Sequence, residues 1–93
     1  MTEVRIEDHI HWDGYQLSVW VNVGARRVFC LVPRDTIHSV PMFNDALTRE
    51  IARDRLEIVD RLRPWILAKI KSSNNDRIFV SPSDVAGFKI RGT

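Results

Sequence analysis

The sequence predicts a two-layer α+β domain in which a mainly antiparallel sheet of three or four strands is covered by a long, kinked helix. Three observations support this: two neighbouring segments with the two-residue alternation of strands, a later stretch with helical three- and four-residue spacing, and a short apolar segment near the end. The expected element order is strand, strand, strand, helix, helix, strand. All 93 residues fit one domain, and a composition with 44 % apolar and 28 % charged residues is typical of a folded chain.

The first two predicted strands lie before residue 24. Residues 4–12 alternate loosely between apolar and polar side chains and end at the turn pair Asp13-Gly14. Residues 16–23 alternate strictly, with leucine and valines on one face. The other face of this second strand carries Ser18, Trp20 and Asn22.

The third predicted strand covers residues 27–32. A short link containing Gly24 separates it from the second strand, which is typical of a β-hairpin. Val28, Cys30 and Val32 alternate with Phe29 and Leu31, so apolar side chains point to both sides. We therefore expect both faces of this strand to be buried.

A short helix is expected directly after the third strand. Pro33 is suited to the first helical position, where its missing N–H costs nothing. Residues 34–40 would form this helix, which ends because Pro41 disfavours the helical conformation at Val40.

A second and longer helix is expected to begin at Asn44, which is a suitable N-cap. Arg55 interrupts its apolar stripe, and Pro64 removes one helical hydrogen bond, so we expect a kink or break near residues 62–64. A last strand is expected at residues 77–80, followed by a turn at residues 81–84. The stripe consists of Leu47, Ile51, Val59, Leu62, Ile66 and Ile70.

The strand Val28-Phe29-Cys30-Leu31-Val32, the charged helix after it and the strand Ile78-Phe79-Val80 resemble a family of short bacterial proteins known only as a domain of unknown function. The resemblance covers residues 16–85 and implies a hairpin, a short helix, a long helix and a final strand. Pro33 and Pro64 depart from the family pattern, which has a serine or threonine cap and an unbroken helix there. The resemblance implies a bacterial cytoplasmic origin and no known activity.

Charge and cysteine content narrow the functional classes. Residues 1–60 carry seven basic and ten acidic side chains, whereas residues 61–93 carry seven basic and two acidic ones. This asymmetry fits an anionic partner, or charges that neutralise each other within the fold or across a dimer. A single cysteine, the acidic start of the chain and the absence of a long apolar run predict a cytoplasmic protein with no export signal and no membrane span.

The sequence contains no pattern typical of an enzyme or a metal site. Cys30 lies among valines on a strand, where cysteine is usually a small buried apolar residue rather than a nucleophile. His9 and His11 would share one side of a strand, but two ligands do not complete a metal site. The four glycines are too scattered for a phosphate-binding loop, so we expect no cofactor.

One candidate function is nucleic-acid binding by the basic C-terminal third. Basic side chains around an aromatic ring can bind phosphates and stack a base. Trp65 also lies among apolar residues and three positions after Leu62, so a core position for its ring is equally open. The candidate residues are Arg61, Arg63, Trp65, Lys69, Lys71 and Arg77, with Lys89 further along the chain.

The leading hypothesis is a non-enzymatic protein that binds another protein, as a homodimer or with a different partner. Trp20, Ser18 and Asn22 lie on the strand face opposite the valines, so one side of the sheet is expected to expose a tryptophan. Tryptophan is enriched at the centres of protein interfaces. The small size of the chain also favours a partner subunit, because a small domain buries a smaller share of its surface.

Overall fold

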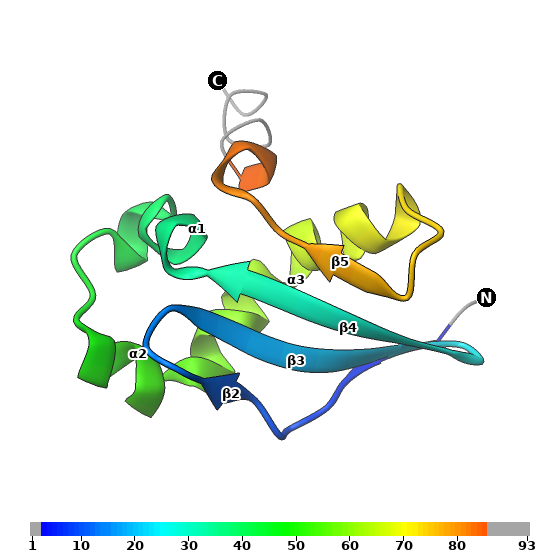
Figure 1. Ribbon diagram of the computed structural model, residues 1–93, viewed down its shortest axis with the longest axis horizontal. Coiled ribbons are helices and arrows are strands. Elements are labelled where there is room, and N and C mark those ends of the chain that lie inside the picture. Colours follow the sequence, from blue (N-terminus) through cyan, green and yellow to red (C-terminus); the bar gives the residue numbers. More distant parts are fainter. Residues whose placement is uncertain (1–2, 86–93) are drawn as a thin grey trace.

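The computed structural model describes residues 3–85 and shows an α+β molecule with a mixed sheet (Figure 1). The α+β class predicted from the sequence is confirmed. Residues 82–85, after the last strand, are also helical. The elements are β1 (Val4–Ile6), β2 (His11–Trp12), β3 (Gln16–Val23), β4 (Arg26–Pro33), α1 (Arg34–His38), the 3-10 helix η1 (Pro41–Phe43), α2 (Thr48–Arg53), α3 (Arg55–Lys71) and β5 (Arg77–Phe79).

The sheet has the order β1-β3-β4-β5, and β2 pairs with β3 beside β1. β1, β2 and β4 all run antiparallel to β3, whereas β5 runs parallel to β4. Three of the four strand pairings are therefore antiparallel, as expected, and the parallel pairing of β4 with β5 makes the sheet mixed. The chain crosses back through the helical segment between β4 and β5, and such a crossover brings the next strand in parallel to the one before it.

The N-terminal segment forms two short strands instead of the single expected one. After Ile6, the backbone N–H of Glu7 still donates to the carbonyl of Trp20 at 3.0 Å, and pairing then stops until His11. The buried Ile10 lies between the two strands, and its carbonyl accepts a hydrogen bond from Arg55 Nε at 2.8 Å.

The hairpin of β3 and β4 matches the prediction closely. β3 has the predicted bounds, and the turn places Gly24 at a φ of +60°, a left-handed conformation that glycine adopts without steric cost. Val23 pairs with Arg26 next to the turn, and the register continues to Gln16 and Pro33 at the far end.

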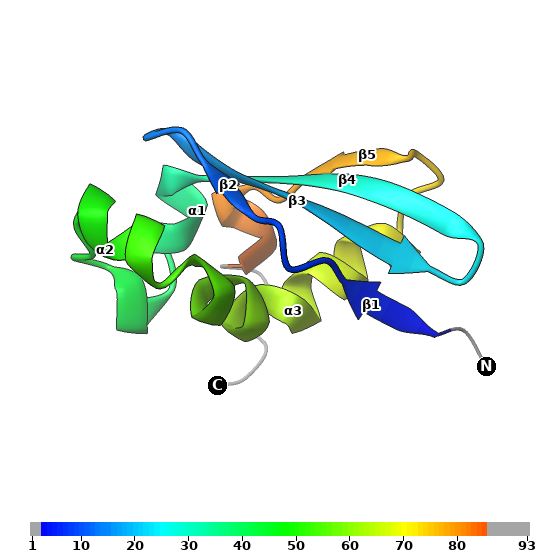
Figure 2. The same cartoon turned by 90° about the horizontal axis from the view of Figure 1, so that it is seen from below.

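The core lies on one side of this hairpin. Alternate residues of β3 and β4 are buried on that side, and five buried residues of α3 belong to the same core cluster. Figure 2 shows the helices on this one side of β3, β4 and β5. The strand residues are Leu17, Val19, Val21, Val28, Cys30 and Val32, and the helix residues are Ile58, Val59, Leu62, Ile66 and Ile70.

The other side of β4 departs from the expectation of burial on both faces. Phe29 and Leu31 are only half-buried, because the described helices all pack against the opposite side. Although β4 has apolar side chains on both faces, helices among residues 3–85 cover only the face with Val28, Cys30 and Val32 (Figure 2).

The bounds of the helices differ in part from the expectation. α1 begins at Arg34 as expected, but Pro33 is the last residue of β4, with an extended ψ of 160°, and does not occupy the first helical position. α1 ends at His38, two residues before the expected end at Val40. Asn44 follows η1 and does not cap α2, which begins at Thr48. At that helix start the backbone N–H of Leu47 donates to the Glu50 carboxylate at 2.7 Å.

The helical segment breaks at Asp54, between α2 and α3, and not at the predicted position. α3 runs through Pro64 from Arg55 to Lys71. Pro64 and Asp60 are both exposed, so the lost helical hydrogen bond lies on the side of α3 that water reaches. Burial of five apolar residues on the opposite side of α3 holds the helix together across this point.

Candidate functional site

The half-exposed side of the sheet is the candidate functional site. Ser18, Trp20 and Asn22 lie opposite Leu31, Phe29 and Arg27 in the β3–β4 register. On the flanking strands, Arg5 pairs with Asn22, Arg77 with Phe29, and Phe79 with Leu31. We call this side the outer face. Its members are Arg5, Glu7, His11, Ser18, Trp20, Asn22, Arg27, Phe29, Leu31, Arg77 and Phe79.

Two aromatic rings form the centre of the outer face. The ring centroids of Trp20 and Phe29 are 4.7 Å apart, and the ring planes are tilted by 48°. The Arg27 guanidinium carbon lies 4.0 Å from the centroid of the Trp20 ring, and the Arg77 guanidinium carbon lies 5.7 Å from that of Phe29. Arginines therefore lie over both rings, an arrangement that the negative ring faces favour.

Arg27 is held in place by a carboxylate. Its Nε donates to Glu7 Oε2 at 2.9 Å and its Nη2 donates to Glu7 Oε1 at 3.1 Å, a two-pronged ion pair. Asn22 Nδ2 also donates to Glu7 Oε2, at 3.0 Å. The hydrogen bond from Arg27 is the main reason why the pKa of Glu7 lies below its ordinary value.

An open depression lies beside the two rings. It is lined by Trp20, Phe29 and Arg77 and, on the loop before β5, by Asn75 and Asp76. Because the Asp76 carboxylate lies 3.4 Å from Arg26 Nε, its charge is shared with that arginine at the rim. Arg77 forms no ion pair within the part of the chain that the structure describes.

The structure does not bring the six nucleic-acid-binding candidates together. Five of them lie on α3, whereas Arg77 lies on the outer face. Arg61 and Arg63 are both exposed, but two residues along a helix correspond to a rotation of about 200°, so they lie on different flanks. Lys71 is exposed near the end of the helix.

Two of these candidates have other contacts. Trp65 is half-buried and packs against the core, as the core alternative expected. Lys69 Nζ lies 3.3 Å from the Asp84 carboxylate. Lys89 lies outside the described residues.

Arg63 also lines a hollow between β1 and α3. Three carboxylates, those of Glu7, Asp8 and Asp60, line the same hollow. Their negative charge opposes phosphate binding at this position. The helix therefore carries no single uninterrupted basic surface among the described residues.

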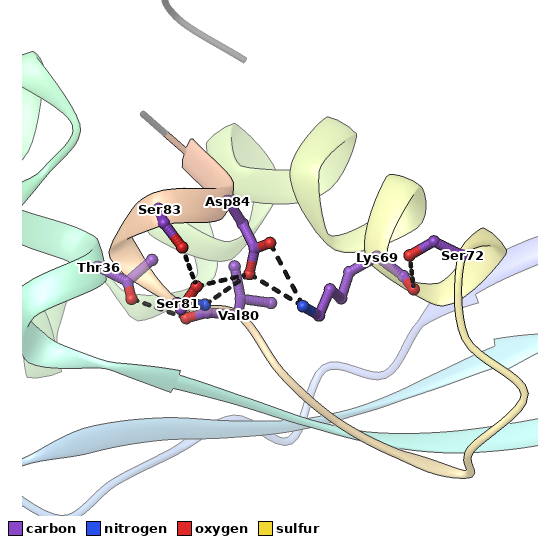
Figure 3. Close-up of polar contacts among 7 residues, drawn as sticks. All are labelled: Thr36, Lys69, Ser72, Val80, Ser81, Ser83 and Asp84. Atoms are coloured by element: carbon purple, nitrogen blue, oxygen red, sulfur yellow. Dashed lines mark hydrogen bonds and ion pairs between the residues drawn. The ribbon is translucent and has the colours of Figure 1, made fainter. Parts of the chain in front are cut away.

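A polar cluster that the sequence analysis did not single out joins residues 80–84 to α3 and α1 (Figure 3). Ser81 donates to Asp84 Oδ2 from its backbone N–H at 2.8 Å and from its hydroxyl at 2.9 Å, as in a helix capping box. The buried Thr36 hydroxyl donates to the Val80 carbonyl at 2.7 Å. The spacing Ser-Pro-Ser-Asp is the sequence signal for this cap, and the cluster fixes residues 80–84 against the helices.

In the Asp84 carboxyl group, burial raises the pKa. The hydrogen bonds from Ser81 and the ion pair with Lys69 lower it by more, and the net pKa lies below the usual value. Asp84 is therefore a charged capping group in this cluster.

Cys30 and the histidines do not form a reactive centre. Cys30 is completely buried, and burial raises the pKa of its thiol to about 12, so the reactive thiolate is scarce at neutral pH. This confirms the predicted core position. His9 and His11 are exposed, and within residues 3–85 no group of three or more histidine, cysteine, aspartate or glutamate side chains could hold a metal ion.

Comparisons were made with family models, curated proteins and solved structures. None of them matches this chain. The functional argument therefore depends on the outer face itself. Among residues 3–85, no helix is long and apolar enough to cross a membrane.

The sequence analysis missed most of the outer face. It singled out Trp20, Ser18 and Asn22, and it placed Arg77 in a different site. The available signal was the Gly24 turn, which fixes the hairpin register and sets Phe29 opposite Trp20 and Arg27 opposite Asn22.

Proposed function

We propose that this protein is a non-enzymatic binding module that docks another protein, or a second copy of itself, through the outer face. The observation that supports this most directly is that no helix among residues 3–85 covers the outer face (Figure 2). The Trp20–Phe29 pair lies at the centre of this face, and Phe79 is half exposed. Tryptophan and arginine together are the residues that most often contribute binding energy at protein interfaces.

In this proposal the molecule works as two layers. The sheet presents the outer face, and α3, bent at Pro64, supports the sheet from behind. A cytoplasmic location is part of the proposal and is supported by the single buried cysteine, since a small secreted domain usually carries several disulfides. The resemblance to short bacterial cytoplasmic proteins points in the same direction.

The proposal is tested by photo-crosslinking in cells that express the protein. Phe79 is replaced by the photoreactive amino acid benzoylphenylalanine, and Leu56 on α3 is replaced in a matched control. Both positions expose a large apolar side chain, 50 % for Phe79 and 57 % for Leu56, but Phe79 lies on β5 at the edge of the sheet and Leu56 lies on α3.

We expect a protein adduct from position 79 and none from position 56. An adduct with twice the chain mass identifies a second copy, and any other protein mass identifies a different partner. Absence of an adduct at position 79, or equal adducts at both positions, contradicts the proposal.

A second candidate function is nucleic-acid binding through the helix. The observation that favours it is the exposure of Arg61, Arg63 and Lys71, none of which forms an ion pair within residues 3–85. Binding of this kind weakens steeply as salt increases, because counterions are released from the phosphates. Reversal of Arg61 and Arg63 to glutamate should then abolish oligonucleotide binding, whereas Phe79→Ser should leave it unchanged.

A further inference from the structure

The outer face and its rim carry four arginines and three carboxylates. Arg5, Arg27 and Arg77 lie on three different strands, and Arg26 lies at the rim. Glu7 is engaged by Arg27 and Asp76 by Arg26, whereas Glu3 lines a hollow together with Arg5. Arg5 and Arg77 form no ion pair within residues 3–85. Two guanidinium groups at opposite edges of the face therefore have no ion-pair partner among these residues. Arg5 also lines the hollow that contains Glu7, Asp8 and Asp60, so Arg77 is the less encumbered of the two.

The part of the outer face next to Arg77 is apolar, whereas Asn22, Arg27 and Glu7 lie between Arg5 and the rings. Leu31 and Phe79 are neighbours on β4 and β5, and the Phe79 side chain is 50 % exposed. The tilted Trp20–Phe29 pair continues this apolar strip toward β3. A complementary surface must therefore supply apolar contacts at its centre and negative charge at its edges.

The arginines over the two rings argue against a nucleic acid as the occupant. A base needs a free ring face on which to stack. Arg27 lies 4.0 Å above the Trp20 ring, and its ion pair with Glu7 fixes it there. A base could reach Trp20 only by displacing this pair.

The charge also argues against a second copy of the chain. In a two-fold symmetric dimer the same patch faces itself, so the unpaired arginines of one copy would approach those of the other. Like charges brought together in an interface cost free energy. An anionic protein surface does not meet this repulsion.

We infer that the outer face binds an acidic segment of another protein, in which carboxylates pair with Arg5 and Arg77 and an apolar side chain packs against Leu31 and Phe79. This inference rests on the proposed function, and it names the chemistry of the partner.

The test is a selection of peptides from a random library displayed on phage, with the purified full chain as bait. We expect the selected peptides to combine aspartate or glutamate with large apolar residues. A synthetic peptide of the consensus sequence should bind Arg77→Glu about tenfold more weakly than the wild type at low salt. Arg63→Glu on α3 is the matched control and should change the affinity little.

A charge exchange supplies the decisive readout. The peptide in which the acidic positions are replaced by lysine should bind Arg77→Glu more tightly than it binds the wild type. Circular dichroism shows whether Arg77→Glu folds, and Arg5→Glu is the second reversal on a different strand if it does not.

The outcomes separate the two proposals. Selected peptides that lose affinity in Phe79→Ser but carry no acidic residues overturn this inference and leave the proposed function standing. Peptides that bind equally to wild type, Phe79→Ser and Arg77→Glu overturn both. A selection without enriched peptides, saturable binding of oligothymidylate that Arg77→Glu abolishes, or a dimer that Phe79→Ser dissociates also overturns the inference.

Discussion

At the scale of single residues, Cys30 shows how a strand position determines chemistry. Its side chain points into the core, and burial raises the pKa of the thiol to about 12 from the ordinary 9.0. Because the thiolate is the species that attacks disulfides, we predict that Cys30 does not react with Ellman's reagent (a disulfide thiol probe) in the native protein near pH 8. The same protein in guanidinium chloride should release one equivalent of thiol product.

Replacing Cys30 by serine or by alanine distinguishes the effect of a buried polar group on stability from the effect of lost side-chain volume. Serine places a hydroxyl among valines and should lower the free energy of unfolding by about 1–3 kcal/mol, more than alanine does. Urea unfolding measures both. Rapid reaction of the native thiol, or a serine variant as stable as the alanine variant, would contradict the buried position.

The Glu7–Arg27 pair predicts a pH dependence of stability. The hydrogen bond from Arg27 is the largest cause that holds the pKa of Glu7 below its ordinary value of 4.5. The folded protein therefore binds this proton more weakly than the unfolded chain, and the pair stabilises the fold above that ordinary value. This contribution is lost as the pH falls through the lower pKa of the folded state.

We therefore expect Glu7→Gln to lower the urea midpoint at neutral pH and to change it less at about pH 3. Glu57→Gln, at an exposed position of α3, removes the same charge and is the control. A difference between wild type and Glu7→Gln that is constant across this pH range would show that the ion pair does not cause it.

The residue scale also shows why the candidate site was only partly predictable. Trp20 could be found because a tryptophan among polar residues stands out on an alternating strand. Arg27 and Phe29 belong to the site because they pair with Asn22 and Trp20 across the hairpin. Arg77 belongs to it because β5, far along the chain, pairs with β4. A single strand pattern contains none of these pairings.

At the scale of secondary-structure elements, α3 carries an internal proline that it accommodates at a cost. Pro64 lacks the N–H that would bond to the Asp60 carbonyl, and both residues are exposed. We predict that Pro64→Ala raises the free energy of unfolding by about 1–2 kcal/mol, because the regained hydrogen bond outweighs the added freedom of the unfolded chain.

Arg63→Ala is the control for this helix. It changes a neighbouring exposed residue and should alter the free energy of unfolding by less than about 0.5 kcal/mol. Thermal unfolding monitored by circular dichroism compares the two variants. If Pro64→Ala is no more stable than the wild type, the proline is not a source of strain in α3.

A strand or helix could be predicted where its pattern depends only on residues close together in the sequence. The alternation in residues 16–23 matches β3 residue for residue, because Leu17, Val19 and Val21 on one face of that strand are buried. The break at Asp54 was not predictable, since it accompanies a long-range contact in which Arg55 donates to the Ile10 carbonyl. The parallel direction of β5 likewise depends on how the whole helical segment returns to the sheet.

At the scale of the whole molecule, the charge distribution in space differs from that along the chain. The first 60 residues contain more acidic than basic side chains, yet Arg5 and Arg27 from this part lie on the outer face. In the part of the chain after position 60, the basic Lys69 pairs with Asp84. The acidic Asp76 from this part pairs with Arg26 from the first part. The linear asymmetry therefore neither locates the cationic surface nor identifies its partner.

This surface predicts opposite salt dependences for its two kinds of occupant. Added salt screens charges over a Debye length of about 10 Å at 0.1 M, so it weakens attraction to carboxylates and also weakens repulsion between two copies of the chain. We expect the dissociation constant of an acidic peptide bound at the outer face to rise with salt in fluorescence anisotropy. In sedimentation equilibrium the chain should stay monomeric at low salt, because the unpaired arginines of two outer faces repel most strongly there. A dimer that is tightest at low salt would instead require carboxylates opposite Arg5 and Arg77, supplied by another surface of the same chain or by the exposed Asp76 at the rim, and it would contradict the inferred acidic partner.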